Sequence, residues 1–231
     1  MFRRTVVLVL LSCSVAFARN HTVSLGTPMK VKLFVGPEEK QPMEITVRTL
    51  IVDGKIREFV TGDTHDVTDH VFVARTAFRM NDSLPDDGRT QPKWRWQRGG
   101  WVSVDRESGR VATLNLPDFD PYYSVASWYR DYVAYCGISS DAEKVYAIVA
   151  EIGDRKPIVK KLLGNSTNAE VPDSECGAPV WARQPMRVTF SPKDKPVVTY
   201  EVHGHASQPQ IPDDNNDAGD SSKPTSTPEA H

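Results

Sequence analysis

Residues 94–164 determine the expected fold, and they read WRWQRGGWVSVDRESGRVATLNLPDFDPYYSVASWYRDYVAYCGISSDAEKVYAIVAEIGDRKPIVKKLLG. The stretch contains Trp94, Trp96, Trp101 and Trp128, which are four of the five tryptophans of the chain. Because large aromatic side chains dominate the energetics of a core, we expect the main hydrophobic core to form around this stretch. Three short apolar runs alternate with turn residues, a pattern typical of consecutive β-strands.

Short β-rich runs separated by turns also occupy both flanks of this stretch. Asp53-Gly54 separates two β-branched runs and predicts a hairpin. Residues 71–80 alternate, and we expect the even-numbered side chains from Phe72 to Met80 to face the core. The expected strands are 29–35, 44–52, 55–60, 71–80, 101–104, 110–116, 128–137, 144–151, 157–162, 186–191 and 196–202. With no convincing amphipathic helix, the sequence predicts an all-β protein, either an antiparallel β-sandwich or a partial or small propeller-like arrangement of hairpins.

The N-terminal residues have the pattern of a secretory signal peptide. Arg3 and Arg4 form a positive region, an apolar run follows, and Ala16-Phe17-Ala18 is a small-x-small cleavage site. The apolar run is too short to span a membrane, so we expect no transmembrane segment in the mature chain. The protein is therefore expected in the periplasm or outside the cell. The alternative is a lipoprotein signal in which Cys13 becomes the lipidated N-terminus.

The composition changes sharply near the C-terminus, where Pro, Asp, Asn, Ser and Thr prevail. Such a segment cannot bury enough apolar surface to order itself, and it predicts a disordered tail. The expected organisation is a signal peptide at 1–18, a single β-rich domain at 19–204 and a disordered acidic tail at 205–231.

Cysteine usage agrees with export. If Cys13 leaves with the signal peptide, only Cys136 and Cys176 remain, and two cysteines in an exported chain predict one disulfide. Such a bridge would contribute roughly 3–4 kcal/mol in the chain-entropy model. The alternative is two unpaired buried thiols.

Charge excludes one class of partner. The chain carries a net charge of −2, so loss of the signal peptide's two arginines leaves −4. The tail itself carries −4, because five carboxylates oppose Lys223, and the folded part is therefore about neutral. Proteins that bind nucleic acid have a clustered basic face, and a folded part that is about neutral gives no reason to expect one.

Aromatic and basic residues interleave at the start of the central stretch. Arg89, Lys93, Arg95, Arg98, Arg106 and Arg110 surround three of the tryptophans. Such a pattern is able to bind a polyanion, a glycan or a protein partner of the cell envelope. The alternative is that the arginines stack on tryptophan within the fold. The predicted binding surface consists of Trp94, Arg95, Trp96, Arg98, Tyr122 and Tyr123.

Two further groups of residues are candidates for chemistry. His65, Asp66, Asp69 and His70 form the best metal-like cluster, although a polar turn uses the same residue types. Asp118 and Asp120, beside paired tyrosines, are able to act as the carboxylates of a sugar site or to form a turn.

No motif for nucleophilic catalysis or for a bound cofactor is present. The chain contains neither G-x-S-x-G nor G-x-G-x-x-G nor a phosphate loop, so no cofactor is expected.

Two segments resemble the blades of β-propellers of the periplasmic Tol-system and quinoprotein types. Residues 138–147 are similar to S-x-D-G-K-x-Y but have Ala142-Glu143 near the usual Gly, and residues 190–195 are similar to F-S-P-D-G-K but have Lys193-Asp194. The block 52–164, with WQRGGW and WYRDYVAYCG, also resembles an uncharacterised family of exported bacterial proteins. These resemblances imply β hairpins and export, and they imply no activity.

The leading hypothesis from the sequence is an exported, non-enzymatic β-rich interaction or envelope-associated protein. The alternative is a carbohydrate- or cell-wall-active enzyme or accessory that uses Asp118, Asp120 and the nearby aromatic residues.

Overall fold

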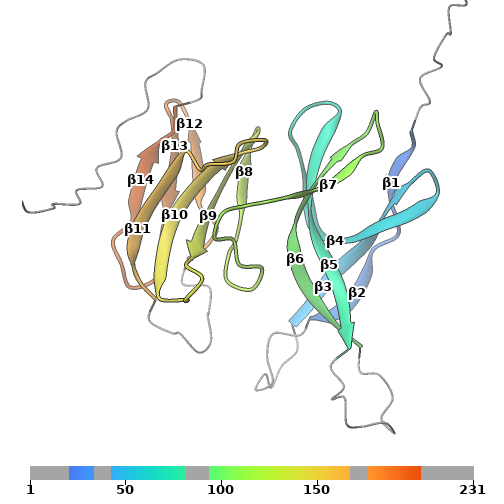
Figure 1. Ribbon diagram of the computed structural model, residues 1–231, viewed down its shortest axis with the longest axis horizontal. Helices are drawn as coiled ribbons and strands as arrows, with labels where there is room; N and C mark the ends of the chain where they lie inside the picture. The colour runs from blue at the N-terminus through green and yellow to red at the C-terminus, as the bar shows by residue number, and fades with distance from the viewer. Residues whose placement is uncertain (1–20, 34–42, 82–93, 167–175, 204–231) are drawn as a thin grey trace, which may run out of the picture.

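The computed structural model describes residues 21–33, 43–81, 94–166 and 176–203. These residues form fourteen β-strands and no helix, which confirms the predicted all-β class (Figure 1). The predicted signal peptide and the predicted tail from residue 205 lie outside the described residues. The strands are β1 (Val23–Leu25), β2 (Met29–Leu33), β3 (Met43–Val52), β4 (Lys55–Asp66), β5 (Val71–Asn81), β6 (Trp94–Asp105), β7 (Val111–Leu114), β8 (Ser127–Tyr129), β9 (Tyr132–Ile138), β10 (Lys144–Glu151), β11 (Val159–Asn165), β12 (Val180–Arg183), β13 (Met186–Phe190) and β14 (Val198–Glu201).

The first seven strands form one sheet that closes on itself. Its order is β1-β3-β2-β6-β5-β4, with β7 paired to β6. The ring from β2 to β6 closes because β3 also pairs with β4, while β2 meets β6 in parallel at Leu33 and Trp96. The predicted hairpin turns at Asp53 and Gly54, whose φ angles of 51° and 74° are those of a type I′ turn. We call β1 to β7 the closed sheet.

Two apolar clusters lie on opposite faces of the closed sheet. Phe59 and Val60 are consecutive in β4 and belong to different clusters, because successive side chains of a strand point to opposite faces. The first cluster contains Leu33, Ile45, Val47 and Ala77, with Val31, Phe59 and Trp96 packed against it. The second contains Leu50, Val60, Phe72, Ala74, Val102 and Val104.

The even-numbered side chains of β5 are buried only in its first half, where the odd-numbered Val73 is buried as well. Ala74 is buried, but Phe78 and Met80 are 45% and 39% exposed, and Ala77 is buried instead. The register of β5 against β6 shifts between Arg75 and Ala77. A one-residue irregularity moves all later side chains to the other face. The prediction that the even-numbered side chains face the core is therefore wrong beyond this shift.

The remaining strands form a two-sheet sandwich, with one sheet ordered β11-β10-β9-β8 and the other β12-β13-β14. The cluster between the sheets includes Tyr123, Phe190 and both bridged cysteines. The sulfur atoms of Cys136 and Cys176 are 1.95 Å apart, so the predicted disulfide is confirmed. All seven residues of β9 are buried, because a second cluster around Tyr135 covers the other face of that sheet. We call β8 to β14 the sandwich.

The two blade-like segments form the turns of hairpins in the sandwich. The first joins β9 to β10, where Asp141 Oδ1 accepts hydrogen bonds from the Ser139 hydroxyl and the Glu143 amide. The second joins β13 to β14. Ala142 and Asp194 have φ angles of 59° and 58°, a backbone region that favours glycine. The chain therefore keeps the turn conformation where its sequence departs from the glycine of the blade pattern.

The closed sheet and the sandwich meet around Trp128 in β8. Its ring lies edge-on to Trp101, with the ring centroids 5.1 Å apart, and it stacks on His65 at 6.0 Å. His65 Nε2 forms a hydrogen bond of 2.8 Å with the carbonyl oxygen of Arg130. A strand of the closed sheet is thus tied to the turn that follows β8.

Arg75 supplies the second link between the two parts. Its guanidinium group donates to the carbonyl oxygens of Gly99 and Pro121, and it lies over the ring of Phe119. Burial lowers the pKa of Arg75 to about 10, the charge of Arg98 adds to the lowering, and Asp120 opposes it. Arg75 therefore remains charged at neutral pH, and the two carbonyl acceptors offset part of the cost of burying that charge.

Candidate binding surface

Two tryptophans and an arginine form a ladder at the start of β6. Trp96 pairs with Arg79 of β5 in the antiparallel register, and Trp94 pairs with Asn81. The Arg79 guanidinium carbon lies 5.7 Å from the ring centroid of Trp94 and 5.5 Å from that of Trp96. Both distances are within the range of a cation–π contact. We call Trp94, Arg79 and Trp96 the Trp–Arg ladder.

The ladder has one anchored and one open ring. Trp96 is half-buried and packs edge-on against Phe59, with the ring centroids 5.2 Å apart. Trp94 is 59% exposed. Of the two tryptophans, Trp96 therefore packs inward and Trp94 stays exposed. The buried ring fixes the strand, and the exposed ring is available for contact.

Arg98 extends the same face of β6, because it follows Trp96 by two residues. Its guanidinium Nη2 lies 3.5 Å from the sulfur of Met43 on β3. Arg98 also lines a shallow cavity of about 370 Å³ between β3 and β4. The other lining residues are Ile45, Thr46, Arg48, Thr61, Gly62 and Asp63.

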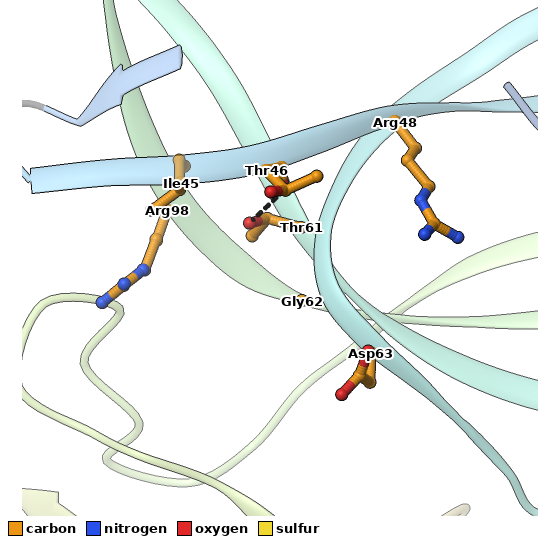
Figure 2. Close-up of a pocket in the computed structure, with 7 residues that line it drawn as sticks. All are labelled: Ile45, Thr46, Arg48, Thr61, Gly62, Asp63 and Arg98. Atoms are coloured by element: carbon orange, nitrogen blue, oxygen red, sulfur yellow. Dashed lines mark hydrogen bonds between the residues drawn. The ribbon is translucent and has the colours of Figure 1, made fainter. Parts of the chain in front are cut away.

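The cavity is polar and open. Figure 2 shows Arg48 and Arg98 at its two ends, with guanidinium groups that point in different directions. Between them the Thr61 hydroxyl donates a hydrogen bond of 2.9 Å to the Thr46 carbonyl oxygen. Arg48 pairs with Val60 and Arg98 pairs with Ala77, which belong to the clusters on opposite faces, so the two arginines leave opposite faces of the closed sheet.

The structure separates the residues of the predicted binding surface. Trp94, Trp96 and Arg98 share one face of β6, whereas Arg95 lies between them in sequence and points to the opposite face. Tyr122 is 47% exposed, but it lies in the segment before β8 that also contains Pro121. Burial, followed by the charge of Asp120, raises the pKa of the Tyr122 hydroxyl.

Tyr123 does not belong to any surface. It is completely buried and is part of the cluster between the two sheets of the sandwich. Because Tyr122 and Tyr123 are adjacent, the sequence offers no means of deciding which ring points inward. Including Tyr123 in the predicted surface was therefore wrong.

The four residues of the metal-like cluster have other partners. His65 contacts the sandwich, and Asp66 Oδ1 forms an ion pair of 2.6 Å with Arg106. The Asp69 carbonyl oxygen accepts a hydrogen bond from Arg106, and His70 Nδ1 lies 3.1 Å from Glu107 Oε1. In the described part of the chain, no group of three or more His, Cys, Asp or Glu side chains is placed to hold a metal ion.

Asp118 and Asp120 both have structural partners. Asp118 Oδ2 lies 2.7 Å from Lys160 Nζ. Asp120 Oδ1 accepts hydrogen bonds from the backbone amides of Tyr122 and Tyr123, at 2.7 and 2.9 Å. This is the turn chemistry of aspartate, in which the carboxylate binds amides two and three residues further along.

Arg79 is the member of the ladder that sequence reasoning missed. It lies fifteen residues before Trp94 in the chain, so it does not belong to the run of basic residues around the tryptophans. Its position follows only from the register of β5 against β6. Placing strand 71–80 antiparallel to the tryptophan strand would have suggested an Arg–Trp contact, although not the partner residue.

No family model, no curated protein and no solved structure matches this chain. Among the residues that the structure describes, no helix has the length and apolar character needed to cross a membrane. A functional proposal must therefore rest on the geometry of the chain itself.

Proposed function

We propose that this protein is an exported, non-enzymatic binding protein that attaches to a component of the cell envelope through the Trp–Arg ladder. The observation that carries the proposal is the 59% exposure of Trp94 beside a tryptophan and an arginine that are fixed by the fold. Tryptophan and arginine are the residue types most enriched among those that dominate binding energy.

Trp94 is the most exposed of the five tryptophans. Trp101 is 7% exposed, and Trp96, Trp128 and Trp181 are half-buried. Exposing a large apolar ring to water is unfavourable, since burial of such a side chain contributes roughly 1.5–3 kcal/mol. A partner that covers Trp94 would recover that contribution.

The partners of Asp118 and Asp120 support the binding proposal over the enzymatic alternative. In the described structure Asp118 is engaged with Lys160, and Asp120 binds two backbone amides. A glycosidase needs two carboxyl groups that face the scissile bond, one as acid and one as base or nucleophile. These two aspartates instead support the segment between β7 and β8.

The location is proposed from the sequence. The positive region, the apolar run and the Ala16-Phe17-Ala18 site support cleavage by the export machinery. Intact-mass measurement of protein from its native host should give a chain that begins at Arg19. A lipidated chain that begins at Cys13 would replace soluble export with membrane anchoring, and a chain that retains Met1 would remove the export proposal.

Binding is tested by co-sedimentation with envelope fragments purified from the native host. We expect the wild-type protein to sediment with the fragments and Trp94→Ala to remain in solution. The matched control is Val180→Ala, since Val180 is 67% exposed in β12 of the sandwich and should not contribute. Equal sedimentation of all three proteins would show that the ladder is not the binding surface.

A further inference from the structure

The ladder face of the closed sheet is basic. Arg79 and Arg98 lie on this face, whereas Arg48, which pairs with Val60, lies on the opposite one. Neither Arg79 nor Arg98 forms an ion pair with a carboxylate in the described part of the chain. Among the described residues that line the adjoining cavity, Asp63 is the one carboxylate.

We propose that the ligand of this face is an acidic polysaccharide, whose sugar rings pack on Trp94 and whose carboxylate or sulfate groups bind Arg98. This inference rests on the proposed function and names the ligand class of the same surface. A sugar ring has an apolar C–H face that complements an exposed indole. An arginine fork binds a carboxylate or sulfate through two parallel hydrogen bonds, which are stronger than those between neutral groups.

The geometry favours a polymer over a small ligand. Trp94 and Arg98 are four residues apart on one strand, so their Cα atoms are separated by about 13 Å at the usual rise of a β-strand. A single sugar is too short to cover the exposed ring and also reach Arg98, whereas successive units of one chain are able to do so.

The backbone around the ladder argues against an extended acidic peptide. Peptides that add a strand to a sheet need a free edge with unpaired amide and carbonyl groups. At Trp96, β6 pairs with β5 on one side and, through Leu33, with β2 on the other. The edge of β6 is therefore occupied at Trp96, which favours recognition by side chains and suits a glycan that presents rings and acidic groups.

Affinity electrophoresis provides the test, with each probe cast into a native gel. Polygalacturonate supplies carboxylates on sugar rings, dextran sulfate supplies sulfates, dextran is uncharged, and poly-glutamate supplies carboxylates without sugars. We expect retardation by one or both acidic polysaccharides, which identifies the acidic group, and none by dextran or poly-glutamate. The retardation should decrease as salt is added, because charge pairs are screened.

Single variants locate the contact. Trp94→Ala and Arg98→Gln should each weaken binding about tenfold or more, as expected for loss of a stacked ring or a charged hydrogen bond. Arg98→Lys keeps the charge but loses the planar fork, and it should bind between Arg98→Gln and the wild type. Arg155→Gln is the control, since Arg155 is exposed in the sandwich and should leave binding unchanged. A thermal melt of each variant confirms that it is folded.

The outcomes separate this inference from the function on which it rests. If Trp94→Ala loses envelope binding while neither acidic polysaccharide retards the wild type, the ladder binds another ligand and the proposed ligand class is wrong. Equal retardation by dextran would show that charge is not required, and equal retardation by poly-glutamate would indicate an acidic peptide. Either result overturns the inference. Failure of both the sedimentation and the gel would remove the proposed function as well.

Discussion

The closed sheet and the sandwich bury their strands to different extents. In the sandwich, β9 is buried at every position and the Cys136–Cys176 bridge lies inside the core. In the closed sheet, β6 begins with Trp94 exposed, and buried and half-buried positions follow from Gln97 to Trp101. Met43, next to Arg98, is also exposed. One end of the closed sheet therefore exposes a tryptophan and a methionine beside an arginine, whereas β9 of the sandwich exposes no side chain.

The closed sheet is held together by other means than a cross-link. No disulfide joins its described strands, but the ring from β2 to β6 gives each of its strands two hydrogen-bonded neighbours. Closure of a sheet removes its free edges and so protects it from unwanted strand pairing. An exposed tryptophan is compatible with this arrangement because the backbone of Trp94 pairs with Asn81 of β5.

The largest expected effect is that of Trp101→Ala. Trp101 is 7% exposed and packs against Trp128 where the two parts meet. Truncation should lower the free energy of unfolding by about 3–5 kcal/mol, as large aromatic truncations in a core do. Denaturant titration measures this directly. A variant as stable as the wild type would mean that the contact between the two parts contributes little.

Reduction of the disulfide should have the next largest effect. The bridge spans a sequence separation of 40 residues, and its loss should cost roughly 3–4 kcal/mol in the chain-entropy model. We expect a melting temperature lower by several degrees in reductant, with ligand binding at the ladder retained in the folded protein. Peptide mapping without reductant should recover one linked pair. If reduction abolished binding before it unfolded the protein, the two parts would not be separable in function.

Arg75→Gln should weaken the contact between the two parts, and its effect on stability should be smaller than that of reducing the disulfide. The substitution removes the charge over Phe119 and weakens donation to the Pro121 carbonyl oxygen. Loss of a hydrogen bond from a charged group costs about 1.5–3 kcal/mol. Calorimetry should show the single transition broadening or splitting, because the closed sheet and the sandwich then unfold less cooperatively. Arg110→Gln, at an exposed turn position, is the control. An unchanged transition would show that Arg75 does not couple the two parts.

Features that depend on residues close together in the sequence could be predicted from the sequence alone. The Asp53-Gly54 turn, the strands of the β9–β10 hairpin and the disulfide were all predicted. Turn residues and alternating apolar residues act within a few positions, so a single chain reveals them.

Features that depend on register could not be predicted. The shift after Arg75 changes which side chains of β5 are exposed, and it places Arg79 against the two tryptophans. Short strands such as β1 and β12 are stabilised by neighbouring strands. Their own composition is therefore not enough to predict that they form strands. The expected strand ended at residue 60, but β4 continues through the polar residues 61–66, including Gly62, whose φ is 71°. The candidate site therefore required the fold before its members could be grouped.

The most direct test of the account is the stability and binding of Trp94→Ala, measured on the same preparation. Because Trp94 is 59% exposed, its truncation should change the free energy of unfolding by no more than about 0.5 kcal/mol. Binding to envelope fragments should nevertheless be lost. A variant that melts like the wild type and no longer sediments with the fragments supports an open binding surface on a rigid scaffold. A variant that is strongly destabilised but still binds would show that the Trp–Arg ladder is a structural element and not the site of contact.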